Sequence, residues 1–177
     1  MSGADTSGSK NLRQDVRIHR ATVADAAGIS AVWGQIVAEG RYSAVARPWS
    51  ASEEAAYIEG LSSREAVFVA SAGGHVVGVQ TLDRWVSYPS FVDHVGQLGT
   101  FLLVESRGRG IGRMLAEGTF AFARKQGYQK LVIWVRASNE AAQRYYVSLG
   151  FRECGRLSRQ LLIDGTYDDE VLMERFL

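Results

Sequence analysis

The sequence predicts a mixed α+β fold in which one mixed sheet carries helices on both faces. Stretches with the two-residue alternation of strands occur near both ends and in the middle of the chain, and stretches with helical spacing of apolar residues lie between them. The expected order is strand, two helices, three strands, helix, strand, helix and two strands. A single sheet covered by helices on both faces accommodates that order.

Signals for helix starts and for turns set the bounds in the first half. Thr22 and Ser50 each precede an acidic residue by three positions, which is typical of a capping box. A Gly73-Gly74 pair between two apolar, β-branched runs is typical of a hairpin. The expected elements are a strand at 16–21, helices from Thr22 to Gly40 and from Ser50 to about Leu61, a hairpin at 66–71 and 75–82, and a strand at 95–104.

The second half alternates helices and strands. A helix from Gly110 to about Gln126 ends on the cations Arg124 and Lys125, which suit the negative end of a helix dipole, and Gly127 stops it. A strand at 131–135, a helix from Asn139 to Leu149 closed by Gly150, and two strands around an Asp164-Gly165 turn complete a domain expected to span 16–177.

Composition describes an ordinary globular protein without a global charge signal. The chain has 177 residues and a net charge of +1, so we expect one domain and neither nucleic acid nor an anionic membrane as a partner. No apolar stretch reaches the roughly 18 residues of a membrane helix. Residues 1–15 are polar and lack the apolar core of a signal peptide, so we interpret them as a flexible leader of a cytoplasmic protein.

Cysteine and histidine usage limits the chemistry further. The single cysteine, Cys154, cannot form an internal disulfide, and we interpret it as an incidental thiol rather than a nucleophile. His19, His75 and His94 show no metal-ligand spacing, so no metal site is expected.

Residues 107–112, Arg-Gly-Arg-Gly-Ile-Gly, form the most informative segment, because they join a predicted strand to a predicted helix. Glycine permits positive φ and close backbone approach, so successive N–H groups can converge on an anion. The start of the following helix adds unpaired N–H groups and a positive dipole end. Arg107, Arg109 and Arg113 stand where that dipole disfavours cations, which favours a polyanion at this turn.

Two common nucleotide motifs do not fit this segment. A Walker A loop ends in Gly-Lys-Ser/Thr, whereas Gly112 is followed by Arg113 and Met114, and the dinucleotide fingerprint requires glycine at position 113. The remaining pattern, Arg-x-x-Gly-x-Gly, resembles the acyl-CoA pyrophosphate loop of the GNAT superfamily of N-acetyltransferases.

A second motif supports the same resemblance. The run from Asn139 to Phe151 matches the GNAT pattern N-x-x-A-x-x-x-Y-x-x-x-G-F, and it follows the arginine-glycine loop at the expected distance. Within it, Ala142 and Tyr146 are four residues apart on one helical face, so a small residue leaves space beside a ligand while a phenol projects along the same side.

The resemblance implies a fold and a cofactor. It implies a central mixed, mostly antiparallel twisted sheet flanked by about four helices, with splayed strands at the CoA site. It also implies acetyl-CoA as the acetyl donor. The residues expected to bind this cofactor are Thr100, Phe101 and Leu102 on the strand, Arg107, Gly108, Arg109, Gly110, Ile111, Gly112 and Arg113 in the loop, and Asn139 and Tyr146 on the later helix.

The resemblance also implies the reaction, which is direct attack of an amine on the acetyl carbonyl. Tyr146 is expected to act as general acid toward the departing thiolate, because a phenol pKa of about 10 lies near that of a thiol at about 8.5. Backbone N–H groups of the splayed strand are expected to stabilise the developing oxyanion. Neighbouring Tyr145 is interpreted as a packing residue.

The general base is not evident in the sequence. Family members often carry a glutamate or histidine on the strand before the loop, whereas this chain has Gly96, Leu98 and Thr100 at the alternate positions expected to face inward. The remaining candidates are Glu39, which we take as the base in the working hypothesis, with Asp83 and His94 as alternatives. For each candidate a solvated surface position is the competing interpretation.

The acceptor is expected to be a small-molecule primary amine, amino-acid-like or antibiotic-like. The layout around Arg47-Pro48-Trp49 resembles GNAT members that acetylate amino-acid-like or phosphinothricin-type amines. Trp134 replaces the glutamate of ribosomal-protein N-terminal acetyltransferases, which weakens a peptide or protein substrate without excluding it. A degenerate CoA-binding sensor and a homodimer also stay open. The expected substrate wall consists of Glu39, Arg41, Tyr42, Arg47, Trp49, Trp85 and Tyr88.

Overall fold

A computed structural model describes residues 15–40 and 43–177, and in these ranges it has the predicted order of strands and helices. The leader prediction falls on residues that lie, except for Asp15, outside this part of the chain. The strands are β1 (Arg17–Arg20), β2 (Ala66–Ala72), β3 (His75–Arg84), β4 (Val95–Leu102), β5 (Lys130–Arg136), β6 (Arg152–Ile163) and β7 (Thr166–Phe176), and the helices are α1 (Ala26–Ala38), α2 (Ala51–Gly60), α3 (Ile111–Lys125) and α4 (Glu140–Ser148).

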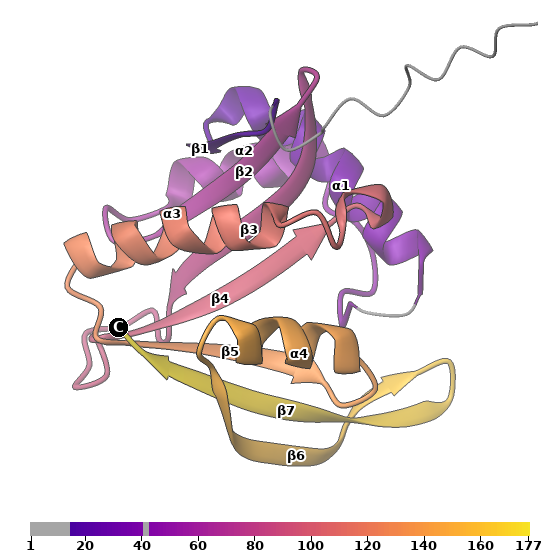
Figure 1. Cartoon of the computed structure of the whole chain (residues 1–177), viewed down its shortest axis with the longest axis vertical. Coiled ribbons are helices and arrows are strands. Elements are labelled where there is room, and N and C mark those ends of the chain that lie inside the picture. Colours follow the sequence, from indigo (N-terminus) through magenta and orange to yellow (C-terminus); the bar gives the residue numbers. More distant parts are fainter. Residues whose placement is uncertain (1–14, 41–42) are drawn as a thin grey trace, which may run out of the picture.

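The strands form one sheet in the order β1-β2-β3-β4-β5-β7-β6. Every neighbouring pair is antiparallel except β4 and β5, which confirms a mixed, mostly antiparallel sheet. The parallel pair is short, because only Val95–Gln97 of β4 pairs with Lys130–Val132 of β5. Beyond these residues the two strands diverge, and Figure 1 shows the opening between them, with β1–β4 above and β5–β7 below.

The backbone of β4 directs polar groups into this opening. Hydrogen bonds at the two ends of the β3–β4 pair join Trp85 to Val95 and Leu103 to Val77, which are all odd-numbered residues. Because hydrogen bonding alternates along an antiparallel pair, the even-numbered residues of β4 direct their N–H and C=O groups away from β3. The backbone groups of Thr100 therefore face the space that β5 has left.

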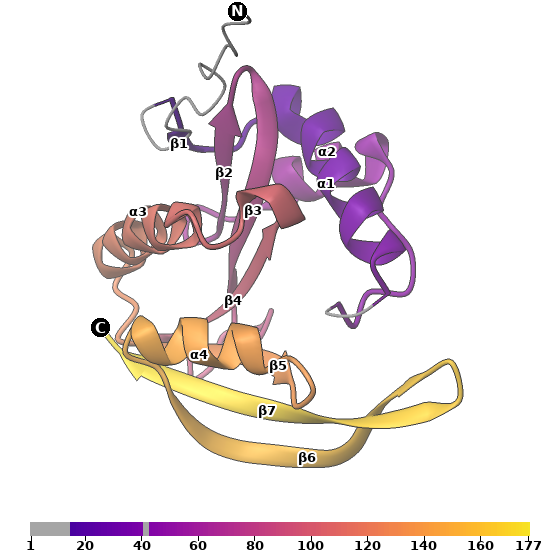
Figure 2. The same cartoon turned by 45° about the vertical axis from the view of Figure 1, so that its right-hand side comes forward.

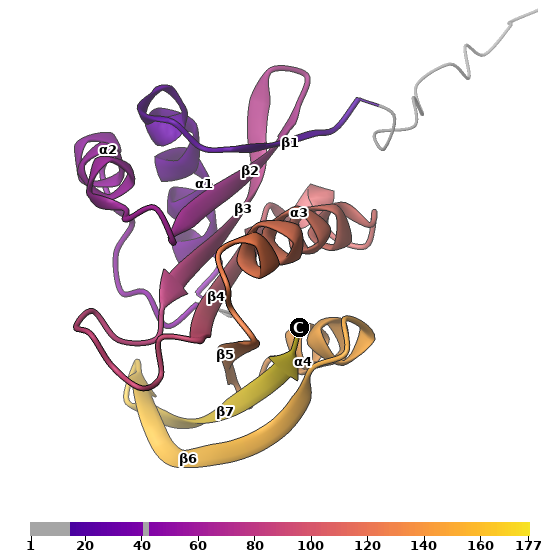
Figure 3. The same cartoon turned by 90° about the vertical axis from the view of Figure 1, so that its left-hand side faces the viewer.

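Helices cover both faces of the sheet, with α1 and α2 on one face and α3 and α4 on the other (Figure 3). Ile29 and Val32 of α1 are buried against Val79 of β3, as their helical spacing predicts. On the opposite face Leu115 and Phe120 belong to the core beneath α3. Both faces of the central strands are consequently apolar, so a polar side chain there needs a hydrogen-bond partner or a ligand.

Both predicted capping boxes are present. The Asp25 carboxylate accepts hydrogen bonds from the Thr22 N–H at 2.8 Å and from its hydroxyl at 3.1 Å, and one turn of 3-10 helix at Val23–Asp25 precedes α1. Ser50 accepts from the Glu53 N–H at 3.3 Å at the start of α2. The capping signals therefore predicted both helix starts from local sequence alone.

Two strands end at other residues than expected, and the first of them, β3, continues to Arg84 instead of ending at Leu82. The strand expected to reach Val104 ends at Leu102, because Val104–Ser106 form a 3-10 turn that leads into the arginine-glycine loop. The β6–β7 hairpin, turning at Asp164-Gly165 as expected, is long and curved and extends beyond α4 (Figure 2). None of the helices in the described ranges is both long and apolar enough to cross a membrane.

Candidate active site

The arginine-glycine loop is open on the side that a ligand would approach. Gly108 and Gly110 have φ of +69° and +80°, and Gly110 is the N-cap residue immediately before α3. A Cβ at Gly108 would meet no atom within 4 Å. Because the first N–H groups of a helix have no intrahelical partner, the start of this 15-residue helix presents donors to the same space. These features fit a bound phosphate or pyrophosphate group.

Arg107 holds the loop to two other parts of the chain. Its guanidinium forms a bidentate ion pair with Glu39, just after α1, at 2.7 and 2.8 Å. Its Nε donates to the Leu102 carbonyl at 2.9 Å. Both contacts are partly buried, so Arg107 fixes the end of β4 relative to α1.

The helix α4 packs beside this loop, and its second half contacts the start of α3. The Asn139 side chain accepts a hydrogen bond from the Ala142 N–H at 3.1 Å and so caps the helix. Tyr145 donates to the Gly112 carbonyl at 2.8 Å, and a Cβ at Gly112 would lie 3.0 Å from its ring. Glycine at 112 therefore permits close packing of α4 on the start of α3, and Tyr145 has the packing role expected for it.

Two cavities meet between the splayed strands. The first, the loop cavity, has about 590 Å³ and extends from Arg107, Gly108 and Arg113 to α4. The second, the α2 cavity, has about 400 Å³ and extends from the opening toward α1 and α2. The residues that line both cavities, and so mark their junction, are Thr100, Phe101, Asn139, Ala142 and Tyr146.

Tyr146 lies at this junction with its ring almost fully buried. It packs against Tyr145 and Phe151, with ring centroids 4.9 and 5.4 Å away. Burial raises the pKa of Tyr146 to about 12, and a hydrogen bond with Thr100 opposes that rise. The Thr100 hydroxyl in turn accepts from the Gln80 amide at 2.8 Å. Tyr146 is therefore a neutral phenol near neutral pH, and its ring contacts hold it in position.

Three carboxylates, those of Glu54, Asp83 and Glu170, line the α2 cavity together with Tyr57. Asp83 lies on the β3 face that α2 covers, and the Tyr57 hydroxyl donates to its carboxylate. Glu54 precedes Tyr57 by one helical turn and is only 2% exposed. Burial raises the pKa of Glu54 to about 7 and also raises the pKa of Asp83. Burial and the neighbouring Asp168 raise the pKa of Glu170 as well.

Sequence reasoning missed Glu54, although a signal for it was present. Tyr57, Ile58 and Leu61 follow Glu54 at three, four and seven positions, the spacing of the buried stripe of a helix. A glutamate on that stripe either has a buried partner or faces a cavity. The preceding residue, Glu53, belongs to the capping box of Ser50 and marks the helix start.

The other base candidates are placed elsewhere. The Glu39 carboxylate is paired with Arg107 and does not line the α2 cavity. His94 is exposed and lies outside both cavity walls. Five consecutive residues of β4, from Gln97 to Phe101, line the α2 cavity. They include Leu98 and Thr100, which were expected to face inward, and also the alternate residues between them. No described ionisable side chain of this strand lines the cavity.

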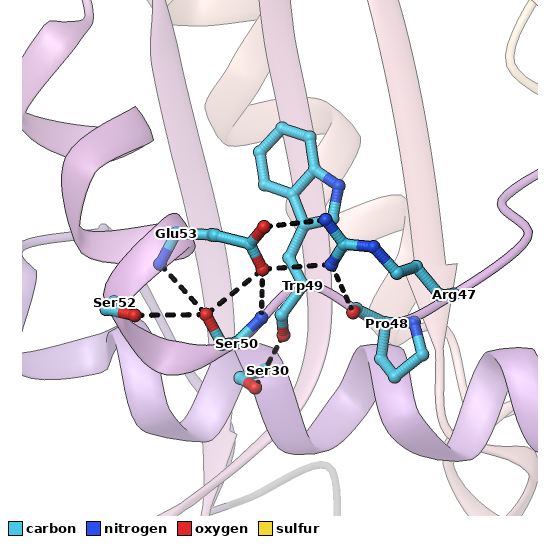
Figure 4. Close-up of polar contacts among 7 residues, drawn as sticks. All are labelled: Ser30, Arg47, Pro48, Trp49, Ser50, Ser52 and Glu53. Carbon is cyan, nitrogen blue, oxygen red and sulfur yellow. Dashed lines mark hydrogen bonds and ion pairs between the residues drawn. The ribbon is translucent and has the colours of Figure 1, made fainter.

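The expected substrate wall is only partly assembled. Trp49 lines the α2 cavity and meets Tyr57 edge to face at 5.5 Å. Arg47 does not line it, because its guanidinium forms a bidentate pair with Glu53 at 2.7 and 3.0 Å, in the cluster around Ser50 that Figure 4 shows. Arg41 and Tyr42 lie outside the described residues.

The later loop contributes indirectly. Trp85 stacks on Trp134 at 6.3 Å, and Trp134 lines the α2 cavity, whereas Tyr88 is 64% exposed and does not. In the described ranges, no group of three His, Cys, Asp or Glu side chains is arranged to hold a metal ion. Cys154 is exposed on β6, away from both cavity walls.

Splayed strands, a glycine-rich loop at a helix start and a buried tyrosine at the junction define an acyl-CoA acetyltransferase type of site. The chain belongs to the acetyltransferase (GNAT) family, whose family model matches residues 35–151. An uncharacterized N-acetyltransferase of Methanocaldococcus jannaschii is 31% identical over 100 residues, which are 55% of this chain and 44% of that protein. This chain thus spans less than half the length of that relative.

Two solved structures illustrate the fold. A ribosomal-protein-alanine N-acetyltransferase from Brucella melitensis is 26% identical, with a TM-score of 0.82 over 91% of this chain and 99% of that chain. A GNAT phosphinothricin acetyltransferase from Sinorhizobium meliloti, solved in complex with AcCoA, is 21% identical, with a TM-score of 0.82 over 92% of this chain and 89% of that chain. The second likeness concerns the fold alone.

Proposed function

We propose that the protein is an N-acetyltransferase that moves an acetyl group from acetyl-CoA to a primary amine of a small molecule. The observation that carries this proposal is the meeting of the two cavities at Thr100 and Tyr146. One cavity has the features of a pyrophosphate site, and the other contains carboxylates and aromatic side chains. A reaction between two substrates requires such a junction.

The loop cavity fits CoA. Backbone N–H groups from Gly108 to Arg113 would hold the pyrophosphate, and the outward Thr100 carbonyl and Leu102 N–H would pair with the pantetheine arm. Asn139 caps α4 where the two cavities join and would contact the cofactor there. Bound acetyl-CoA would supply the acetyl thioester.

The chemistry then falls to groups at the junction. As the nitrogen–carbon bond forms, the carbon–sulfur bond breaks, and an acceptor that enters as an ammonium ion loses two protons. One proton ends on the thiol and the other goes to solvent. The Tyr146 hydroxyl would donate a hydrogen bond to the departing sulfur, and the Thr100 N–H would stabilise the developing oxyanion.

The base role passes in this proposal from Glu39 to the carboxylates of the α2 cavity. Asp83 pairs in register with Gln97, and its Cα lies roughly 10 Å along β3 from that of Gln80, which pairs with Thr100. Side chains and one water can span that distance to an amine at the junction. Glu54 and Asp83 would therefore accept the proton that the amine loses.

Replacing Glu39 by glutamine is expected to weaken CoA binding several-fold and to destabilise the protein by about 1–2 kcal/mol, because Arg107 loses a charged partner. We expect kcat to change little. Steady-state kinetics and calorimetric CoA binding measure the two effects separately. A fall in kcat of about 100-fold with unchanged CoA affinity would return the base role to Glu39.

The proposed function is tested with purified protein, acetyl-CoA and a panel of amines, by following release of free thiol. We expect turnover with small amines and lower kcat/KM for peptides, since Trp134, stacked on Trp85, lines the cavity and takes up space that an extended chain would need. Peptides with the higher kcat/KM would favour a protein acetyltransferase. Tight CoA binding without turnover on any amine or peptide would favour a sensor module.

A further inference from the structure

The described wall of the α2 cavity carries more negative than positive charge. Glu54, Asp83 and Glu170 line it, and Arg136 is the one cationic side chain among its described residues. The Arg136 Nε donates to Asp168 at 2.9 Å, so a carboxylate already pairs with this guanidinium, while its buried Nη1 has no hydrogen-bond partner. An anionic group of a ligand would meet three carboxylates here. A cationic group would meet carboxylates whose negative charge exceeds the positive charge of the wall.

Glu54 supplies the observation that points to a ligand. Its side chain lines the cavity and is 2% exposed, and its Oε1 has no hydrogen-bond partner. A buried carboxylate oxygen without a partner is costly, because desolvation is then not repaid by a hydrogen bond or a counter-charge. An ammonium group of a bound ligand would supply both.

Tyr57 and Trp33 hold the carboxylates in place. The Tyr57 hydroxyl donates to Asp83, and Tyr57 also packs edge to face on Trp49. Trp33 shares a hydrogen bond with Glu54 that opposes the rise of its pKa. Neither contact brings a positive charge, so the pair is rigid but not neutralised.

The remainder of the wall is apolar and largely aromatic. Trp33, Trp49, Phe101 and Trp134 line the cavity together with aliphatic residues of β2, β3 and β5. Gly99, between the carboxylates and the junction, has no side chain there, and a Cβ would lie 3.0 Å from the Thr81 hydroxyl. An apolar body therefore fits the cavity, and the passage to Tyr146 stays open.

We propose that the α2 cavity selects a primary amine that has an apolar or aromatic body and no carboxylate beside the amine, and that Glu54 and Asp83 bind it as the ammonium ion. This inference rests on the proposed function, because it names the acceptor class of that site. It departs from the amino-acid-like acceptor expected from the sequence. The carboxylate of an amino acid would lie against Glu54, Asp83 or Glu170 and would be repelled.

The proposal makes binding dependent on pH. Burial raises the pKa of Glu54 to about 7, so this carboxylate is ionised above pH 7 and neutral well below it. The titratable groups around it are Glu53 and Tyr57 on α2, Asp83 on β3, Glu65 before β2 and Glu170 on β7. Because an alkylamine stays protonated over this range, its affinity should rise about tenfold from about pH 6 to about pH 8.

The test measures binding directly, by calorimetry with CoA present, so that it does not depend on turnover. The probes are phenethylamine and phenylalanine, which differ only by the carboxylate. We expect phenethylamine to bind about tenfold or more tightly than phenylalanine. In Glu54→Gln we expect that preference and the pH dependence to be lost. Glu59→Gln, on the exposed side of the same helix, is the matched control and should retain both.

Each outcome bears on the inference. Four results would overturn the inference. They are equal or tighter binding of phenylalanine, tighter binding of spermidine than of phenethylamine, binding of neither probe, and a Glu54→Gln variant that binds like the wild type. Thiol release with amino acids in any of these cases would leave the proposed function standing. If the ammonium preference is present but no amine is acetylated, the binding inference stands and the proposed function fails.

Discussion

Replacing Tyr146 by phenylalanine is expected to lower kcat about 10²- to 10⁴-fold while changing the affinity for CoA little. The substitution removes only the hydroxyl at the junction of the two cavities and leaves the ring against Tyr145 and Phe151. Steady-state kinetics and calorimetric CoA binding give the two quantities. Since burial raises the pKa of Tyr146 to about 12, the phenol stays protonated, so its loss should lower the rate similarly from about pH 6 to about pH 9.

Tyr145→Phe provides the matched comparison. It removes a neighbouring hydroxyl that donates to the Gly112 carbonyl, so we expect a stability loss of about 1 kcal/mol and weaker CoA binding with kcat nearly retained. If Tyr146→Phe instead unfolds the protein while the folded fraction keeps full specific activity, Tyr146 is a packing residue. A thermal melt of both variants separates these cases.

The free energy of unfolding is expected to fall as pH rises through about 7, and Glu54→Gln is expected to remove most of that fall. Burial raises the pKa of Glu54 from its ordinary 4.5 to about 7, so the folded state binds this proton more tightly than the unfolded state. The resulting stabilisation is fully present below the unfolded pKa and is lost as pH rises through the folded one. Its upper bound is about 3 kcal/mol.

Urea unfolding at about pH 5 and about pH 8 measures the effect, with Glu59→Gln as the exposed control on the same helix. Burial also raises the pKa of Asp83, which contributes with the same sign, whereas the pKa of Glu65 is lowered and contributes with the opposite sign. The difference between wild type and Glu54→Gln isolates the one carboxylate. Identical pH dependence in the two proteins would mean that Glu54 is already paired or hydrated. Saturating amine should also reduce the difference, because a bound ammonium favours the ionised form.

Local sequence predicted the elements well because their boundaries depend on local chemistry. The capping boxes at Thr22 and Ser50 and the Gly73-Gly74 and Asp164-Gly165 turns each involve residues a few positions apart. The arginine-glycine loop was readable for the same reason, since its donors come from consecutive backbone groups. The expected strand ends differ from the observed ones by up to two residues, as at Leu82 and Val104.

Contacts between distant residues were not readable in the same way. Glu39 was expected to act as the base, and nothing in the sequence indicated that its carboxylate pairs with Arg107, 68 positions away. Glu54 was not singled out in the sequence, and the fold buries it in the wall of the cavity that Asp83 also lines. A charged side chain far from its partner in sequence carries no local sign of that partner.

The sequence by itself determined the sheet-and-helix order, the glycine-rich turn before α3 and the helix that carries Tyr146, because periodicity, glycine conformation and capping act over a few residues. Only the tertiary structure decided which charges remain unpaired. The divergence of β4 from β5 after Gln97 opens the junction, and the packing of α2 on β3 buries Glu54 and Asp83 beside it. Charge and desolvation depend on what surrounds a group in space, and that surrounding is set by elements distant in the chain.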